Sequence, residues 1–393
     1  MSRLGSAPYT DFQYCVRCCM PETNEGIVFD EMGICQACFS YEQKMRIDWA
    51  AREKRLRAIL EDYKGRAGTN YDCLVPISGG KDSAFQLHVL TQVYGVKPLA
   101  VTFSHNWFSE TGRYNLDNVL EKFNVDHIMF TPNRGLVNRL ARRSLEKIGD
   151  SCWTCHGGVG AFPLQVAVKF GIPLIVWGES NAEDSGRASY RDPVMTFDRD
   201  YFTKTSAKEY ATGMVGEGIT LRDVQPFELP SVEDCERVGL VGLHLGDFLF
   251  WDGERQMEFL RDTYGWREDH VEGSYKRYKS VECMMAGVHD YAKWIKRGFG
   301  RGTDQASADV RAGLLTREEA MELAKAVDST RPEALDYYLQ ITGYTEDEFI
   351  EILKKHRRGK MNLLPAEYLK KRSLPEHPAL RPAVVASTDP VHK

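Results

Sequence analysis

The amino-acid sequence predicts an α/β protein: a parallel sheet with helices on both faces, preceded by a small cysteine-rich module and followed by a mostly helical C-terminal region. Three observations predict this class. Apolar runs of strand length alternate with helix-length segments between residues 73 and 177, two C-x2-C pairs lie near the N-terminus, and amphipathic helical patterns dominate from residue 231 onward. Apolar strands that alternate with helices are typical of parallel sheets buried on both faces.

The composition is that of a globular protein of 393 residues, for which about two or three folding units are expected. Its formal net charge of −5 argues against a nucleic-acid partner, because domains that bind phosphate backbones are usually basic. No apolar run approaches the roughly 18 residues of a membrane span, and the N-terminal sequence MSRLGSAPYTDF lacks the apolar segment of a signal peptide. We therefore expect a cytoplasmic protein without a membrane span, in which the ten cysteines serve metal sites or catalysis more than disulfides.

Residues 1–40 carry two C-x2-C pairs, Cys15 with Cys18 and Cys35 with Cys38. The stretch between the pairs reads as a small β-hairpin. Four thiolates at this spacing can surround one Zn²⁺ tetrahedrally, in a segment too small to fold on core burial alone. We predict a zinc-ribbon-like module; the alternative is four reduced cysteines without metal. Residues 41–68 contain a helical pattern of apolar side chains and are expected to form a connector helix.

The stretch YDCLVPISGGKDS, residues 71–83, reads as a strand, a tight loop and the start of a helix. The consecutive glycines Gly79 and Gly80 let backbone N–H groups approach an anion, at which the positive end of the next helix also points. Two serine hydroxyls and Lys81 add further donors. The spacing differs from that of a Walker A loop, but the chemistry is that of phosphate binding.

This loop resembles the PP-loop, SGGxDS, of the ATP pyrophosphatases, and it matches that pattern at every position. The resemblance implies a PP-loop Rossmann-like sheet that binds ATP and Mg²⁺, releases pyrophosphate and leaves an adenylated substrate. The residues that it implies at the nucleotide are Ser78, Gly79, Gly80, Lys81, Asp82 and Ser83, of which Lys81 and Asp82 are also expected to be catalytic. The alternative is a glycine-rich turn in an ordinary strand–helix unit. We place the nucleotide domain at residues 69–230.

The alternation of strands and helices continues from this loop to residue 177. The expected strands are Cys73–Ile77, Lys97–Phe103, Val125–Phe130 and Ile172–Trp177, and the expected helices are Ala84–Val93, Arg134–Ile148 and Val159–Phe170. Ligands of parallel sheets bind at the carboxyl ends of the strands. In the superfamily that the loop resembles, the adenosine lies over these strand ends; the resemblance therefore implies Thr102 and Ser104 for contact with adenine or ribose, and Gly178 and Glu179 for contact with ATP or acceptor. His105, after the second strand, is a candidate base.

A third C-x2-C pair, Cys152 and Cys155, precedes a glycine pair and a helix. Three interpretations are open: a redox or nucleophilic pair, two ligands of a metal or iron–sulfur cluster, or part of the substrate pocket wall. Cys283 could complete a set of three ligands. Some PP-loop thiolation enzymes hold a cluster with a C-x2-C pair and one distant cysteine.

After residue 181 the alternation is expected to stop, with a polar, substrate-facing insertion over residues 182–230. Residues 231–372 are expected to be mostly helical, including one helix over Leu245–Tyr264, and residues 373–393, rich in proline, to be a flexible tail. The segment KRGFGRGTD, residues 296–304, reads as a flexible anion-contacting loop in which Arg301 is suited to bidentate phosphate recognition. A plain basic turn is the alternative.

Taken together, these motifs resemble one family across nearly the whole chain: the N-acetyl sugar amidotransferases of bacterial surface-polysaccharide and nonulosonic-acid biosynthesis. The stretches that carry the resemblance are CVRCCMPET, GICQAC, SGGKDS, CWTCHGGVGAFPLQVAVKFGIPLIVWGE, HDYAKWIKRGFGRGTDQASADVR and TREEA. The resemblance implies an ATP-dependent enzyme that converts an acetamido group into an acetamidino group, with Arg301 as a third catalytic residue. It also implies lipopolysaccharide or O-antigen biosynthesis as the setting.

The resemblance further implies a separate source of ammonia: a HisH-like glutaminase subunit with a HisF-like channel subunit. The acceptor would be an N-acetylated sugar, nucleotide- or lipid-linked. The rival prediction is a PP-loop thiolation enzyme, acting on a tRNA base or a small metabolite, with an iron–sulfur cluster at Cys152, Cys155 and Cys283. A second rival is a non-enzymatic zinc-ribbon adaptor, against which the intact SGGKDS sequence argues.

Overall fold

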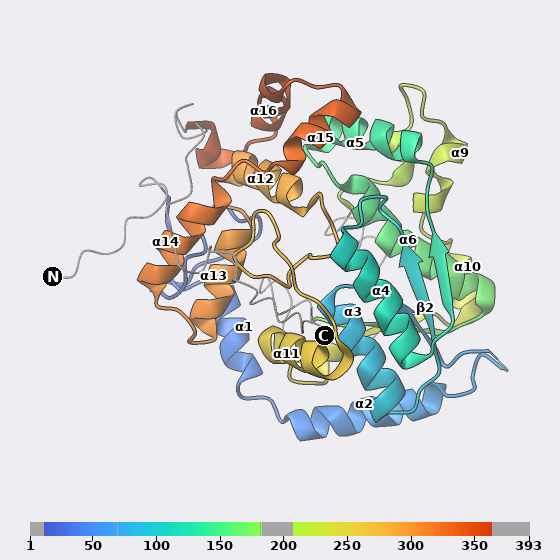
Figure 1. Cartoon of the computed structure of the whole chain (residues 1–393). Helices are drawn as coiled ribbons and strands as arrows, with labels where there is room; N and C mark the ends of the chain where they lie inside the picture. Colours follow the sequence, from blue (N-terminus) through green and yellow to red (C-terminus); the bar gives the residue numbers. More distant parts are fainter. Residues whose placement is uncertain (1–11, 69, 181, 183–206, 364–393) are drawn as a thin grey trace, which may run out of the picture.

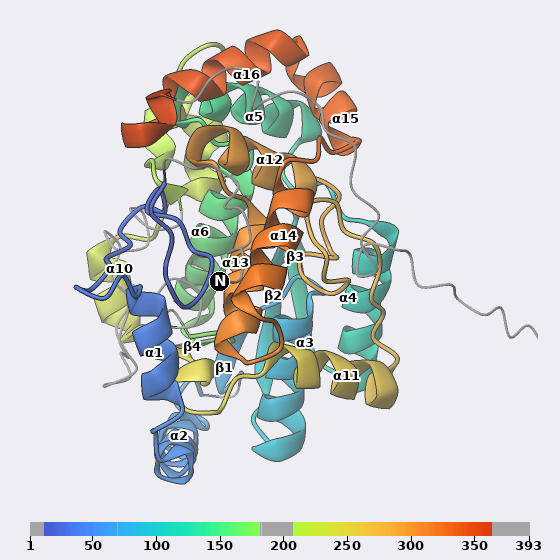
Figure 2. The ribbon, with the colours of Figure 1, turned by 90° about the vertical axis from the view of Figure 1, so that its left-hand side faces the viewer.

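The structure, a computed structural model, describes residues 12–363 except 69, 181 and 183–206. It confirms the predicted α/β class, with a five-stranded parallel sheet of order β3-β2-β1-β4-β5. Figure 1 shows the whole chain, and Figure 2 labels β1 to β4 of the sheet. The strands are β1 Cys73–Pro76, β2 Pro98–Phe103, β3 His127–Phe130, β4 Leu174–Trp177 and β5 Val241–His244. The tail predicted at 373–393 and much of the insertion predicted at 182–230 lie outside the described residues.

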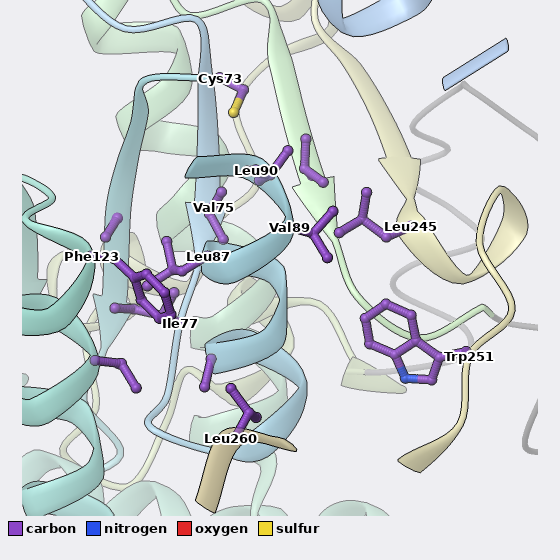
Figure 3. Close-up of a cluster of buried hydrophobic side chains, with 14 of the residues drawn as sticks. Cys73, Val75, Ile77, Leu87, Val89, Leu90, Phe123, Leu245, Trp251 and Leu260 are labelled. Carbon is purple, nitrogen blue, oxygen red and sulfur yellow. The ribbon is translucent and has the colours of Figure 1, made fainter. Parts of the chain in front are cut away.

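Helices cover both faces of the sheet, because alternate side chains of each strand point to opposite faces. On one face, Val75 and Ile77 pack with Leu87 of helix α3 (Lys81–His88), as Figure 3 shows. On the other face, Leu74 packs with Leu164 of helix α6 (Trp153–Phe170). Both apolar layers are buried, so the end of β1 and the start of α3 are held in place by the core.

Between β1 and β4 the structure has four helices, of which the sequence predicted three. They are α3, continued by a π-turn at Val89–Val93, α4 Glu110–Phe123, which was not predicted, α5 Arg134–Ile148 and α6. Helices α9 Leu221–Val224, α10 Val232–Val238 and α11 Gly253–Tyr264 follow. Short 3-10 turns occupy Ala211–Met214, Gln225–Phe227 and Leu245–Asp247. The bounds of α5 are those predicted, whereas α6 begins six residues before the predicted Val159 and so includes Cys155 in its first turn.

Two expectations for this region are corrected. The alternation was predicted to stop after residue 181, but β5 continues it by pairing with β4. Residues 245–264 were predicted to form one helix, but α11 begins only at Gly253, after a 3-10 turn at Leu245–Asp247. Strand β5 is four residues long and contains Gly242, whose missing side chain leaves room for the Trp177 ring; a Cβ atom there would lie 2.6 Å from that ring. The glycine and the final histidine interrupt the apolar residues of this strand, so the sequence shows no apolar run that would predict it.

The cysteine-rich module contains two antiparallel bridges, Tyr14 with Pro21 and Phe29 with Cys35, and leads into two helices instead of one. Helix α1 covers Gln36–Lys44 and α2 covers Trp49–Tyr63. The break between them ends at Asp48, whose side chain caps α2 by accepting a hydrogen bond from the Ala51 N–H at 2.9 Å.

The C-terminal helices form a layer against which this module packs (Figures 1 and 2). They are α12 Ala286–Arg297, α13 Arg301–Arg311, α14 Arg317–Asp328, α15 Ala334–Thr342 and α16 Glu346–Lys355, followed by a 3-10 turn at Gly359–Leu363. Arg317 donates from Nε to the carbonyl oxygens of Cys15 and Cys18 at 3.0 and 3.1 Å. Among the described residues, no helix is long and apolar enough to cross a membrane.

Candidate active site

The loop between β1 and α3 packs so closely against α4 that its residue 79 must be glycine. Gly79 has a φ of +85°, and a Cβ atom there would lie 2.6 Å from the carbonyl oxygen of Gly112 in α4. The Gly79 carbonyl oxygen accepts a hydrogen bond from Trp266 Nε1 at 3.0 Å. The loop therefore cannot shift outward, and it keeps the first N–H groups of α3, which have no acceptor within the helix, directed at one place.

The two serines close the loop on itself. Ser78 Oγ accepts from the Gly80 N–H at 3.3 Å, while Ser83 Oγ accepts from the Ser78 N–H at 3.3 Å and donates to the Gly80 carbonyl oxygen at 3.0 Å. These bonds preorganise the turn before any ligand arrives, so the backbone donors need little rearrangement to meet a phosphate.

Lys81 and Asp82 form an ion pair at the start of α3. Lys81 is buried and its ammonium contacts the Asp82 carboxylate, which also accepts from Trp251 Nε1 at 2.9 Å. Burial alone would raise the pKa of Asp82, but the ammonium groups of Lys81 and Lys279 outweigh it and hold that pKa below its ordinary value. Asp82 is therefore an anion available to a metal ion.

A segment from far along the chain, residues 274–283, lies against this loop. Lys279 Nζ lies 3.6 Å from Glu179 Oε1, and Lys81 Nζ lies 5.8 Å from the centroid of the Tyr278 ring. Glu282 comes closest: its Oε2 atom would lie 3.2 Å from a Cβ atom at Gly80. The sequence reasoning missed Tyr278, Lys279 and Glu282, because nothing in the sequence links them to a motif about 200 residues earlier.

Glu282 has the features of a ligand-binding carboxyl group. Within the described part of the chain, its Oε2 atom is buried and has no hydrogen-bond partner. Burial raises the pKa of Glu282 above its ordinary value, against the opposing effect of Arg301. A buried carboxylate oxygen without a partner is costly unless a cation or donor meets it. Mg²⁺ prefers oxygen ligands, so Asp82 and Glu282 fit a magnesium ion carried by ATP.

The strand order places this loop at a reversal point of the sheet. β2 and β3 extend from one side of β1, and β4 and β5 from the other, so the loops after β1 and β4 diverge and leave a crevice between them. Gly178 and Glu179 follow β4; a Cβ atom at Gly178 would lie 3.1 Å from the Trp251 ring. Glu179 and Asp82 thus lie on either side of Lys279, as expected for the carboxyl ends of adjacent parallel strands.

Thr102 and Ser104 are buried at the end of β2, and their hydroxyl groups have partners in the protein. Thr102 Oγ1 donates to the Ile77 carbonyl oxygen at 2.9 Å and lies 2.8 Å from His127 Nε2. Ser104 Oγ accepts from the Asn106 N–H at 3.3 Å. Their contact with adenine or ribose stays a prediction.

His105 is buried beside them, and its ring stacks on Phe108 with a centroid distance of 4.6 Å. Burial lowers the pKa of His105 to about 4, so its imidazole is neutral at pH 7. Its Nδ1 atom accepts from the Trp107 N–H at 3.1 Å. A neutral imidazole can act as a base, but its role is not tested by these contacts.

The sulfur atoms of Cys152, Cys155 and Cys283 do not form a compact ligand set. The described residues contain two groups whose ligand atoms all lie within 4.8 Å of one another, and these three cysteines are not one of them. Burial raises the pKa of all three thiols. Cys283 Sγ lies 4.0 Å from His105 Nδ1. An iron–sulfur cluster at these cysteines stays a prediction.

The four N-terminal cysteines do form such a group, and all are buried. The sulfur–sulfur distances are 3.9 Å between Cys15 and Cys38, 3.7 Å between Cys18 and Cys35, and 3.7 Å between Cys35 and Cys38. A Zn–S bond of about 2.3 Å in a tetrahedron requires sulfurs about 3.8 Å apart. The donor set therefore fits a closed structural zinc site.

Arg301 lies in the first turn of α13, which corrects the prediction of a flexible loop. Its Nε atom donates to Asp290 at 2.5 Å and one terminal nitrogen donates to Ser280 Oγ at 2.7 Å. The N-terminus of the helix is capped by the carboxylate of Asp328, which accepts from Thr303. A Cβ atom at Gly302 would lie 2.7 Å from that carboxylate, so glycine there makes room for the cap. A catalytic role for Arg301 stays a prediction.

A parallel sheet of this order, with the glycine-rich SGGKDS loop at its reversal point, defines a doubly wound α/β protein. Residues 272–363 match the model of a named family domain, "LPS biosynthesis protein WbpG-like, C-terminal domain". This match begins just before the segment that lies against the loop.

Two further proteins are similar to this chain. The uncharacterized protein MJ1599 of Methanocaldococcus jannaschii is 28% identical over 300 residues, which are 76% of this chain and 88% of that protein. The solved structure of NMN synthetase from Francisella tularensis aligns with 49% of this chain and 92% of its own, at 12% identity and a TM-score of 0.26.

Proposed function

We propose that this chain is an ATP-dependent amidotransferase of lipopolysaccharide biosynthesis. It adenylates the acetamido oxygen of an N-acetylated sugar, and ammonia then displaces AMP to give an acetamidino group. One observation carries the proposal: the region that matches the WbpG-like domain supplies Tyr278, Lys279 and Glu282, which lie against the PP-loop. The phosphate-binding part and the domain linked to lipopolysaccharide thus form one site.

The chemistry follows from the poor leaving ability of an amide oxygen. That oxygen attacks the α-phosphorus of ATP, the bond to the β-phosphate oxygen breaks, and pyrophosphate leaves. Ammonia adds to the carbon of the resulting O-adenylyl imidate, the carbon–oxygen bond breaks, and AMP leaves with the former amide oxygen. The amide N–H proton is lost when the imidate forms, and all three protons of ammonia stay on the amidinium product. The enzyme forms no covalent intermediate, so its contribution is positioning and charge stabilisation.

Each part of that contribution has residues suited to it. The N–H groups of the Gly79–Gly80 turn and the start of α3 bind the phosphates, and the buried Lys81 ammonium stabilises their charge. Mg²⁺, held by Asp82 and Glu282, supplies further neutralisation of the phosphate charge when it is bound. Arg301 keeps residues 280–282 in place through Ser280.

Ammonia comes from a partner in this proposal. A HisH-like glutaminase subunit, with a HisF-like channel subunit, delivers it to the crevice between the loops after β1 and β4. The sugar is nucleotide- or lipid-linked, since the WbpG-like match supports a role in lipopolysaccharide biosynthesis.

The test is a product assay with purified protein, Mg²⁺-ATP, ammonium chloride and UDP-linked N-acetylated sugars, followed by mass spectrometry of the sugar. We expect AMP and pyrophosphate in equal amounts, and replacement of one sugar oxygen by NH, only when ammonium is present. The Lys81→Ala variant should form neither. Cleavage of ATP to ADP, or no turnover with any N-acetylated sugar, nucleotide- or lipid-linked, would contradict the proposal.

The second candidate, thiolation, is kept because Cys155 and Cys283 both lie near enough to Glu282 for its charge to affect their thiols. Anaerobic purification separates the two functions. Stoichiometric iron with the absorption of an iron–sulfur cluster, and sulfur in the product, would favour thiolation, whereas a colourless protein that uses ammonium favours the amidotransferase.

A further inference from the structure

We propose that Asp150, His156 and His289 form a second metal site, distinct from the four-cysteine group, for a divalent transition-metal ion. One ligand atom from each residue lies within 4.8 Å of the other two. Asp150 follows α5, His156 lies in the first turn of α6, and His289 lies in α12. The junction between two consecutive helices and a third helix far along the chain thus place one carboxylate and two imidazoles together.

The Asp150 carboxylate is fixed with one oxygen directed at this group. The residue is buried, and its backbone is held on both sides by Ser144, whose hydroxyl donates to the Asp150 carbonyl oxygen at 2.6 Å. Oδ1 accepts from the Cys152 N–H at 2.7 Å, while Oδ2 lies 3.4 Å from His156 Nδ1. A buried carboxylate needs a cation or several donors to offset its desolvation.

The His156 ring faces this oxygen without a hydrogen bond of its own. Its Nδ1 atom is buried and makes no hydrogen bond within the described part of the chain, although Asp150 Oδ2 lies at ion-pair distance, 3.4 Å away. The ring lies edge-on to that of His289, with centroids 5.2 Å apart and an angle of 87°. Two imidazole rings and a carboxylate whose ligand atoms lie this close together are a typical set of ligands for a transition-metal ion.

His289 has a carboxylate beside one of its ring nitrogens, as metal-binding histidines usually do. Its Nδ1 atom lies 3.2 Å from Asp290 Oδ1, and the other carboxylate oxygen of Asp290 accepts from Arg301. A carboxylate at Nδ1 fixes the tautomer and leaves Nε2 as the nitrogen available for a ligand bond. Since Arg301 also donates to Ser280, the same side chain links this group to the segment that lies against the PP-loop.

An ion pair with Lys208 is the competing explanation. Lys208 Nζ lies 3.3 Å from Asp150 Oδ2, so it can neutralise that carboxylate without a metal. The ion pair accounts for Asp150, but it leaves His156 Nδ1 without a hydrogen bond and does not account for the Asp290 carboxylate beside His289 Nδ1. With an ion bound, the Lys208 ammonium would turn away from Oδ2.

The donor set defines the class of ion. One carboxylate oxygen and two imidazole nitrogens suit Zn²⁺ or Fe²⁺, whereas Mg²⁺ and Ca²⁺ favour oxygen ligands alone. Three protein ligands also leave at least one coordination position open for water or for an oxygen of a bound molecule. The four-cysteine group, in contrast, closes the coordination sphere of its ion.

The experiment measures zinc per chain in the full-length protein after equilibration with Zn²⁺ and removal of the excess. We expect His156→Gln and His289→Gln each to hold one zinc ion fewer than the wild type, because the four-cysteine group is untouched. The matched control is His270→Gln at an exposed histidine, which should hold as much zinc as the wild type. Equal zinc in the wild type and in both variants would overturn the proposal.

Cobalt substitution separates loss of the site from loss of the fold. The thiolate-to-cobalt absorption of the four-cysteine group should be unchanged in His156→Gln and His289→Gln, while the weaker absorption of a nitrogen–oxygen site disappears. Asp290→Asn should weaken binding of the second ion about 10- to 100-fold without removing it, as happens when the carboxylate that orients a metal-binding histidine is changed. Lys208→Met should keep the second ion, and its loss in that variant would contradict our account of Lys208.

Discussion

The two sites that the sequence singled out are built in different ways. The N-terminal cysteine group comes from residues 15–38, so its four ligands meet through two short bridges. The site around the PP-loop is assembled from residues 78–83, 178–179 and 274–283, which meet only when the sheet and the C-terminal helices are in place. The sequence spacing therefore predicts all the ligands of the local site, whereas for the assembled site the sequence predicts the residues of the motif but not those that distant segments contribute.

The largest effect that would sharpen this comparison is loss of a zinc ligand. Cys18→Ser removes one of four thiolates, and we expect the zinc to be lost and the module to unfold, because a structural zinc contributes on the order of 10 kcal/mol to small modules. Zinc content and thermal unfolding measure this. The neighbouring Cys19→Ser is the control: Cys19 contacts Ser307 and is not in the group, so its variant should keep zinc. Zinc loss in both variants would contradict the ligand assignment.

The next effect tests the assembled site. Glu282→Gln keeps the size of the side chain and removes its charge, so we expect kcat to fall roughly 100-fold or more, as when an electrostatic contact to the transition state is lost. Zinc content should be unchanged, since Glu282 is not in the cysteine group, and the unfolding temperature should not fall, since the substitution removes a buried charge whose Oε2 atom has no hydrogen-bond partner within the described residues. Glu258→Gln, at an exposed position of α11, is the matched control and should be fully active. Wild-type activity in Glu282→Gln would remove this residue from the site.

A third effect concerns Asp328, which caps the helix that carries Arg301. Burial raises the pKa of Asp328 to about 6, so the folded protein holds this proton more tightly than the unfolded chain does. The stabilisation is complete below about pH 4 and is lost as the pH rises to about 6. Asp328→Asn removes this dependence, so the unfolding free energy of the variant relative to the wild type should rise across that window, by at most about 3 kcal/mol. Chemical denaturation at pH 4, 5 and 6 measures it; parallel curves would contradict the raised pKa.

The smallest effect separates the two kinds of C-x2-C pair. In Cys155→Ser the metal content should equal that of the wild type, because Cys155 belongs to neither compact ligand group. The change in stability should be within about 1 kcal/mol, as for a single small substitution. Metal analysis and thermal unfolding of the same preparation suffice. Loss of iron in this variant would restore the cluster interpretation.

The sequence predicted the parts of this fold that rest on local patterns. Four of the five strands and the bounds of α5 agree with the structure, because long apolar runs and helical periodicity are local signals. β5 was missed because its four residues include Gly242, and the break before α2 was missed because the helical periodicity runs through it. The loop predicted around Arg301 is a helix whose glycines make room for the Asp328 cap, a contact between residues distant in sequence.

For the site around the PP-loop, too, the sequence predicted only the residues that belong to a local motif or follow a predicted strand. The PP-loop residues lie at the carboxyl end of β1 with Gly178 and Glu179 across the crevice, as strand order requires. Glu282 and Lys279 carry no motif; they lie in the segment that connects α11 and α12, and only the fold brings that segment beside the loop and Asp82. The Asp150, His156 and His289 group has no sequence spacing to identify it, since its third member lies 133 residues after the second.

The central claim is that ATP activates the oxygen of an amide. The most direct measurement uses an N-acetylated sugar nucleotide with heavy oxygen in its acetamido group, together with ATP and ammonium, and follows the label by mass spectrometry. The proposed reaction transfers the label to the phosphate of AMP and leaves the sugar product without it. Heavy oxygen that remains in the sugar while AMP forms, or that appears in inorganic phosphate, would contradict the claim.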